Sequence, residues 1–206
     1  MSELGGQVYA NLMAEAHVRI KALDQLLNNY QAWPPVVLQD FCYLQLRLLC
    51  EMIGLGCLIA HGDITNRNLL KNWDIPRVMR SLEELKPNFF PVPIKMTFAN
   101  GSMNVEPSNA PALTKDELFD LYDLAGSKLH RGSAKSLMAE IDTQKIIVVD
   151  EIVVWAKKII DLLEQHRIAS THGRRNWIVA LNHVESNGMP SLWETEALEP
   201  DSSVAT

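Results

Sequence analysis

An apolar stretch from Val36 to Ala60 constrains this chain more than any other feature of its sequence. It follows Trp33-Pro34-Pro35, and proline suits the first turn of a helix but not its interior, so we expect a helix that runs to about Ala60. A membrane span tolerates few polar groups, and this stretch contains several, so the pattern predicts a buried helix of a soluble protein. The interrupting residues are Gln39, Asp40, Gln45, Arg47 and Glu51.

Further segments show the three- and four-residue apolar spacing of amphipathic helices. They are residues 7–30, 65–72, 75–85, 114–130 and 143–169. One of them opens with a capping-box pattern, Thr114 followed by Glu117. The last carries two apolar rows between residues 146 and 163, so we expect it to lie centrally or against a second subunit.

Two turn pairs predict β-hairpins. Asn100-Gly101 follows an alternating stretch, and Asn187-Gly188 separates two β-prone stretches. The expected fold is therefore mainly α, a bundle of about four to six helices with one or two short hairpins at about 94–106 and 177–195. Residues 1–198 form a single domain in this interpretation, and residues 199–206 a disordered tail.

The composition narrows the classes of function. Hydrophobic residues make up 47% and charged residues 21% of the 206, which is enough apolar material for a proper core. The formal net charge of −6 gives no overall attraction to nucleic acid. The N-terminal residues lack the basic start and apolar run of a secretory signal, so we predict a cytoplasmic protein that does not enter a membrane.

The cysteines and the missing motifs argue against a cofactor. Cys42, Cys50 and Cys57 lie at spacings of eight and seven, without a CxxC pair, which predicts reduced core residues rather than a disulfide or a zinc site. The usual signatures of phosphate-binding loops, dinucleotide folds, serine hydrolases, zinc proteases and EF-hands are absent from the sequence. We therefore predict no metal and no cofactor.

Two charged residues inside the apolar helix are the first candidates for chemistry. Arg47 and Glu51 are one turn apart, so their side chains project from the same stripe of the helix. A charge among apolar neighbours needs a partner, because burying it alone costs on the order of several kcal/mol. The pair can be an ion pair that fixes helix register or faces a groove, or it can be part of a functional polar centre.

A second cluster lies downstream. Tyr122, Gly126 and His130 follow one another at four-residue steps, so they share one side of a helix, and Gly126 allows close approach by another group. Glu51 could orient the imidazole of His130 for acid-base work, with a nearby arginine to hold an anion. The alternative is a structural histidine that caps the helix end.

These residues carry a family resemblance. An Arg-x-x-x-Glu pattern, Arg47 and Glu51, is followed downstream by Tyr-x7-His, Tyr122 and His130, and this resembles the bacterial helical domains of the HEPN superfamily. That group includes abortive-infection and toxin-like proteins. The resemblance implies a helical bundle that commonly dimerises, and either a metal-independent ribonuclease or an inactive relative that binds nucleotides or RNA.

The resemblance covers mainly residues 36–60 and 114–165, and it departs from the nuclease members at one point. Their signature is an arginine followed four to six residues later by a histidine, near the start of a late helix. The formal match here, Arg167 to His172, falls at the end of the last predicted helix, and the composition produces about one such match by chance. This departure weighs against nuclease activity.

A basic cluster, His172-Gly173-Arg174-Arg175, lies beside Trp177. It could hold a phosphate or RNA and stack a base, or it could be a solvated link between two elements.

We arrive at two hypotheses of function. The first is a noncatalytic binding or interaction module that forms a homodimer, and the second is a metal-independent ribonuclease of toxin or phage-defence type that acts on RNA. The candidate catalytic residues are Arg47, Glu51, Tyr122, His130 and Arg131, and the ligand-binding candidates are Arg174, Arg175 and Trp177.

Overall fold

The computed structural model describes residues 2–61, 75–85, 88–99, 101–130, 149–170, 175–182 and 189–196. Five α-helices and five strands lie in these ranges. The helices are α1 (Ser2–Asn28), α2 (Pro35–Ala60), α4 (Ile75–Leu85), α5 (Lys115–Leu129) and α7 (Val149–Leu163), with a short 3-10 helix, η1 (Tyr30–Ala32), between the first two. The mainly α prediction is therefore confirmed at this level. The predicted helix at 65–72 and the predicted tail at 199–206 lie outside the described residues.

Local sequence signals set the helix ends. Pro35 occupies the first turn of α2, as predicted from the proline pair. The capping box of α5 is also confirmed, since the Thr114 side chain accepts from the backbone N–H of Glu117 and the Glu117 carboxylate accepts from the N–H of Thr114. Thr114 thus fixes where α5 begins.

The strands form one antiparallel sheet, larger than the expected one or two hairpins. Its order is β2-β1-β3-β4-β5. The strands are β1 (Val92–Ala99), β2 (Ser102–Pro107), β3 (Gln165–Ser170), β4 (Arg175–Ala180) and β5 (Ser191–Glu196). Both predicted strand pairs are present, β1–β2 and β4–β5, and the predicted turn at Asn187-Gly188 lies outside the described residues. Ala99 pairs with Ser102 across a two-residue connection, where Gly101 has a φ of +75°.

The strand that joins the two hairpins is β3, and here the helix prediction was wrong. We expected helix to continue to residue 169, whereas α7 ends at Leu163. The chain then alternates, with His166 and Ile168 buried and Arg167 exposed, which is the two-residue period of a strand. The prediction was wrong because it extended the helical spacing beyond Leu163 and missed the change to the two-residue period.

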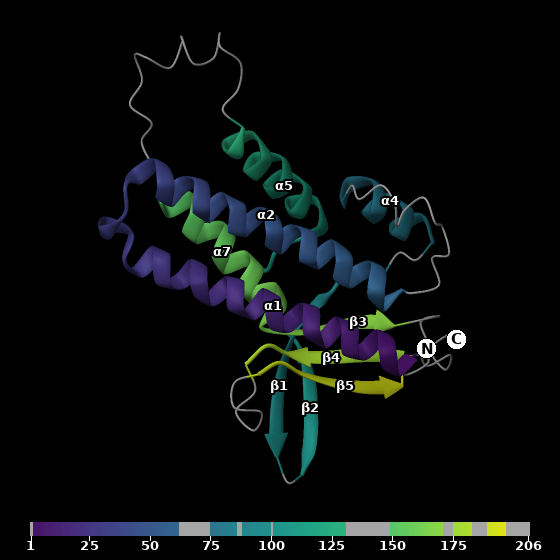
Figure 1. Ribbon diagram of the computed structural model, residues 1–206. Coiled ribbons are helices and arrows are strands. Elements are labelled where there is room, and N and C mark those ends of the chain that lie inside the picture. Colours follow the sequence, from purple (N-terminus) through teal and green to yellow (C-terminus); the bar gives the residue numbers. More distant parts are fainter. Residues whose placement is uncertain are drawn as a thin grey trace.

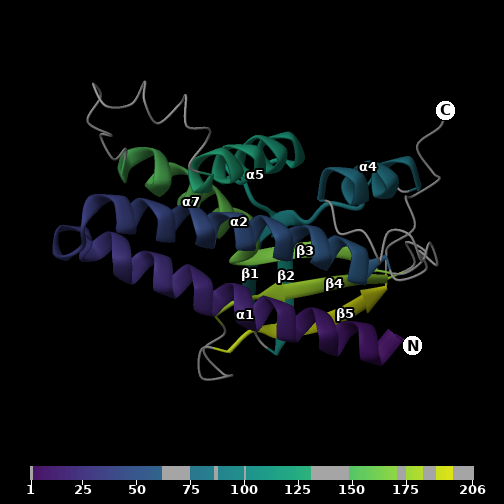
Figure 2. The ribbon, with the colours of Figure 1, turned by 45° about the horizontal axis from the view of Figure 1, so that its top comes forward.

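The helices and the sheet form two layers (Figures 1 and 2). Helices α1 and α2 make an antiparallel hairpin, and α2 runs in front of α7 with α1 on one side and α5 on the other. Strands β3, β4 and β5 lie beside the N-terminal half of α1, and the β1–β2 hairpin projects away from the helices. Helix α7 packs against α1, α2, β1 and β3. The helix with two apolar rows therefore lies centrally, which is one of the two positions expected for it.

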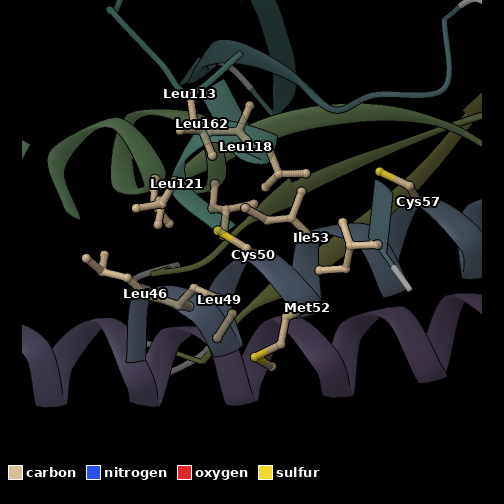
Figure 3. Close-up of a cluster of buried hydrophobic side chains, with 14 of the residues drawn as sticks. Leu46, Leu49, Cys50, Met52, Ile53, Cys57, Leu113, Leu118, Leu121 and Leu162 are labelled. Atoms are coloured by element: carbon tan, nitrogen blue, oxygen red, sulfur yellow. The ribbon is translucent and has the colours of Figure 1, made fainter. Parts of the chain in front are cut away.

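One large apolar cluster holds the helices together (Figure 3). Leu46, Leu49 and Ile53 of α2 meet Leu118 and Leu121 of α5 in its interior. All three cysteines are free and buried in this cluster, as predicted. Burial raises the pKa of the Cys42 thiol to about 11, which keeps it protonated and unreactive.

Candidate functional site

Arg47 is the centre of a polar cluster between α2 and α5. Its Nε lies 3.5 Å from Glu51 Oε1, and its Nη2 donates a hydrogen bond of 2.8 Å to the hydroxyl of Tyr122. The guanidinium carbon also lies 4.2 Å from the centre of the Tyr122 ring, a cation–π distance. The structure therefore brings together three of the predicted residues from two distant stretches of chain.

Gly126 makes room for this arrangement. A Cβ added at Gly126 would lie 2.5 Å from Arg47 Nη1, closer than real Cβ contacts are found. The glycine thus serves the close approach that its position suggested, and the group that approaches is the guanidinium of Arg47. With Nε near Glu51, Nη2 on Tyr122 and Nη1 against Gly126, each nitrogen of the guanidinium has a neighbour within the protein.

The cluster is only partly closed to solvent. The side chains of Arg47 and Glu51 are 29% and 26% exposed. At that exposure the pair is a half-buried ion pair within α2 with a modest contribution to stability. The contact with α5 comes from the hydrogen bond of Arg47 to Tyr122. One turn before Arg47, the Tyr43 hydroxyl donates to Glu151 Oε2 of α7 at 2.9 Å, which links α2 to α7 on the same side.

His130 does not join the cluster. It is the C-cap residue of α5, where its backbone N–H donates to the carbonyl of Gly126, and its side chain is exposed. Among the described residues, no hydrogen bond or ion pair links its imidazole to Glu51, whose partner is Arg47. The capping alternative describes His130 better than the acid-base pair. Arg131 lies outside the described residues.

The second group of candidates does not form a nucleic-acid site in the part of the chain that is described. Trp177 is 3% exposed and packs under α1, with its ring 5.3 Å from that of Tyr9, so it cannot stack on a base. Arg175 is exposed and pairs with Glu194 on the neighbouring strand at 3.1 Å. Arg174 lies outside the described residues.

Sequence reasoning missed a buried polar chain at the junction of α1, α7 and β3. His166 Nδ1 donates to the Leu163 carbonyl at 2.9 Å, which leaves Nε2 to accept from the Tyr9 hydroxyl at 2.8 Å. Burial lowers the pKa of His166 to about 4, so the ring is neutral and both its nitrogens are satisfied. The alternation of β3 is the signal that would have placed this histidine inside. Because His166 is fully buried, it suits a structural role rather than catalysis.

A groove lies between α1 and α7, with α2 beneath it. Its volume is about 370 Å³, within the range of small-molecule sites. The rim is polar, with Asp24 and Asn28 on α1 facing Lys157 and Asp161 on α7, and Lys157 Nζ is bound to Asp161 at 3.0 Å. The apolar lining is Ile20, Leu23, Leu27, Leu49, Val153, Ala156 and Ile160.

Possible metal ligands and membrane-spanning helices also bear on the class of protein. Within the described ranges, no three histidine, cysteine, aspartate or glutamate side chains gather as a metal site would require. One described helix, α2, is long and apolar enough to cross a bilayer, but 67% of its most apolar window is buried inside the protein. An interior helix of this kind passes the same test of length and composition.

Comparison with family models, with curated proteins and with solved structures gives no significant match.

Proposed function

We propose that the protein is a noncatalytic interaction module of the cytoplasm that works as a homodimer. The observation that carries this proposal is the state of Arg47, whose guanidinium is taken up by Glu51, Tyr122 and the space left by Gly126. An acid-base centre would need His130 beside Glu51, and the imidazole is exposed at a helix end instead. The accessible features of the helical layer are a groove and apolar side chains, which serve binding.

The groove between α1 and α7 is the binding site in this proposal. Its apolar floor suits a ligand with an apolar body, and the rim selects the polar end of that ligand. Lys157 is neutralised by Asp161, whereas the described residues provide no ion-pair partner for Asp24. The rim therefore has an excess of negative charge, which favours an apolar ligand with a cationic or hydrogen-bond-donating end.

An NMR titration with alkyl probes tests the groove. An alkylammonium ion should shift signals of Leu23, Leu27 and Val153, and an alkyl carboxylate of the same length should bind more weakly. Ala156→Leu fills the groove and should abolish the shifts. Asp24→Asn should remove the preference for the cation, whereas Asp150→Asn, on an exposed site of α7 outside the groove lining, should not. Shifts scattered over the surface with either probe would contradict the assignment.

An RNA-cleavage assay separates this proposal from the ribonuclease alternative. We expect wild-type protein and His130→Ala to give the same background with single-stranded and structured RNA. Cleavage by the wild type that His130→Ala abolishes would overturn the noncatalytic proposal and support the alternative.

A further inference from the structure

The outward side of α2 carries a row of side chains that is apolar at every position but one. The row comprises Val37, Phe41, Leu44, Leu48, Glu51 and Leu55, at successive steps of four, three, four, three and four. This is the heptad spacing of a helix that packs along a second helix. Val37, Phe41 and Leu44 are 49%, 40% and 41% exposed, although the opposite side of α2 is buried in the core. We call this row the α2 seam.

The neighbours of α2 leave the seam open. Gln45 of α2 accepts from Arg19 of α1 on one flank, at 3.1 Å, and Arg47 contacts Tyr122 of α5 on the other. Buried residues such as Leu46 and Ile53 face the interior. In Figure 1, α1 and α5 lie on either side of α2, and α7 lies behind it. The α2 seam lies between these two flanking helices and therefore points away from the protein.

We propose that the α2 seam holds the α2 seam of a second copy of this chain, with the two helices antiparallel. The proposal rests on the homodimer of the proposed function and assigns its interface. A second copy is the occupant that the charges favour, because an antiparallel pair can bring Asp40 of each copy close to Arg47 of the other. An interface between identical copies uses one patch twice, so its own charges must be complementary.

The register follows from the layers of the seam. An antiparallel pair in which Phe41 meets the partner's Leu44 also sets Val37 against the partner's Leu48, so the layers formed by residues 37–48 are all apolar. Asp40 and Arg47 flank the seam on the α5 side, and this register brings Asp40 of one copy to Arg47 of the other. Asp40 has no ion-pair partner among the described residues. Arg47 keeps its contacts with Glu51 and Tyr122, but its side chain is 29% exposed, so the partner's Asp40 can approach it from the solvent side.

The other arrangements are less favourable for the same physical reasons. A parallel pair would set Glu51 against Glu51 in the seam, two like charges in one layer. Sliding the antiparallel pair by one heptad would set Glu51 against Phe41 and bring the two Arg47 side chains together. Sliding it one heptad the other way would bring the two Asp40 side chains together. The register centred between Phe41 and Leu44 avoids these like-charge contacts, keeps Glu51 out of the apolar layers and leaves it with Arg47.

Sedimentation equilibrium of matched variants tests the location of the interface. Leu44→Glu, at the centre of the seam, should raise the dissociation constant of the dimer by roughly 30-fold or more, as the loss of a central anchor does. Val18→Glu is the control, an apolar-to-acidic change at an exposed position of α1 away from the seam, and should leave the constant unchanged. Asp40→Arg, which would face the partner's Arg47, should raise it by about tenfold.

A disulfide trap tests the register. Oxidation of a mixture of Phe41→Cys and Leu44→Cys chains should link one of each, and each chain alone should crosslink more slowly, since its own thiols are offset along the pair. The native cysteines are buried and do not compete. Fast crosslinking of Phe41→Cys alone would overturn the antiparallel register. A dimer equally unaffected by Leu44→Glu and Val18→Glu would overturn the seam but keep the homodimer, and a wild-type monomer at high concentration would overturn both.

Discussion

Helices α7 and α2 are both strongly apolar, yet the protein uses them differently. The apolar residues Ile152, Ile159 and Leu162 of α7 are buried between the helical layer and the sheet. Helix α2 buries one side in the same core and keeps an ordered apolar row on its other side. We infer from this comparison that total hydrophobicity indicates a core helix, whereas the spacing of the residues that stay exposed indicates where a partner could bind.

The largest expected effect contrasts one residue from each helix. Ile159→Ala should lower the free energy of unfolding by about 2–5 kcal/mol, because it leaves a cavity in a packed core. Leu44→Ala should cost the monomer less than about 1 kcal/mol, because that side chain is already partly in water. Urea unfolding at a concentration below the dimer dissociation constant gives both values. Equal losses would remove the distinction between the two helices.

His166, on the strand that follows α7, should make the free energy of unfolding depend on pH. The pKa of His166 is about 4 in the folded protein and about 6.5 when unfolded, so the unfolded state binds the proton more readily. The stabilisation is therefore complete above pH 6.5 and is lost as the pH falls toward 4, by up to about 3 kcal/mol. Unfolding measured across this range should show that loss in the wild type and a smaller one in His166→Gln. Parallel curves would contradict a buried neutral imidazole.

Gly126 of α5 and Arg47 of α2 should be coupled in their effects on stability. Gly126→Ala should destabilise the wild type by about 1 kcal/mol, because the new methyl group displaces the Arg47 guanidinium. In an Arg47→Ala background the same change should stabilise by roughly 0.5–1 kcal/mol, because alanine favours helix over glycine. A double-mutant cycle measures this reversal of sign. Additive effects would show that the two residues are not in contact.

The smallest effect concerns the start of α5. Thr114→Ala removes the side-chain acceptor of the capping box and should cost about 1 kcal/mol of unfolding free energy. Thr114→Ser keeps the hydroxyl and should cost much less. Thermal unfolding of the two variants compares them directly, and a similar loss in both would mean that the hydroxyl does not cap the helix.

Features with a local cause could be predicted from the sequence. Pro35, the capping box at Thr114 and the turn glycine Gly101 each act within a few residues, and the structure has all three. The pairing of Arg47 with Glu51 could also be predicted, because a charge in an apolar helix must find a partner.

Features set by distant packing could not be predicted in this way. Strand β3 owes its conformation to pairing with β1 and β4 rather than to its own composition. His130 was expected to reach the interior, but α5 ends there and the side chain points to solvent. The groove depends on how α1 and α7 are spaced, and no single segment contains that information.

The most direct test of the second copy on α2 is an isotope-filtered NOE experiment on a mixture of labelled and unlabelled chains. The α2 seam predicts intermolecular NOEs between the Phe41 ring of one chain and the Leu44 methyl groups of the other. Intermolecular NOEs between Phe41 and Phe41, or none from this row while the protein sediments at twice its 23.2 kDa, would contradict it.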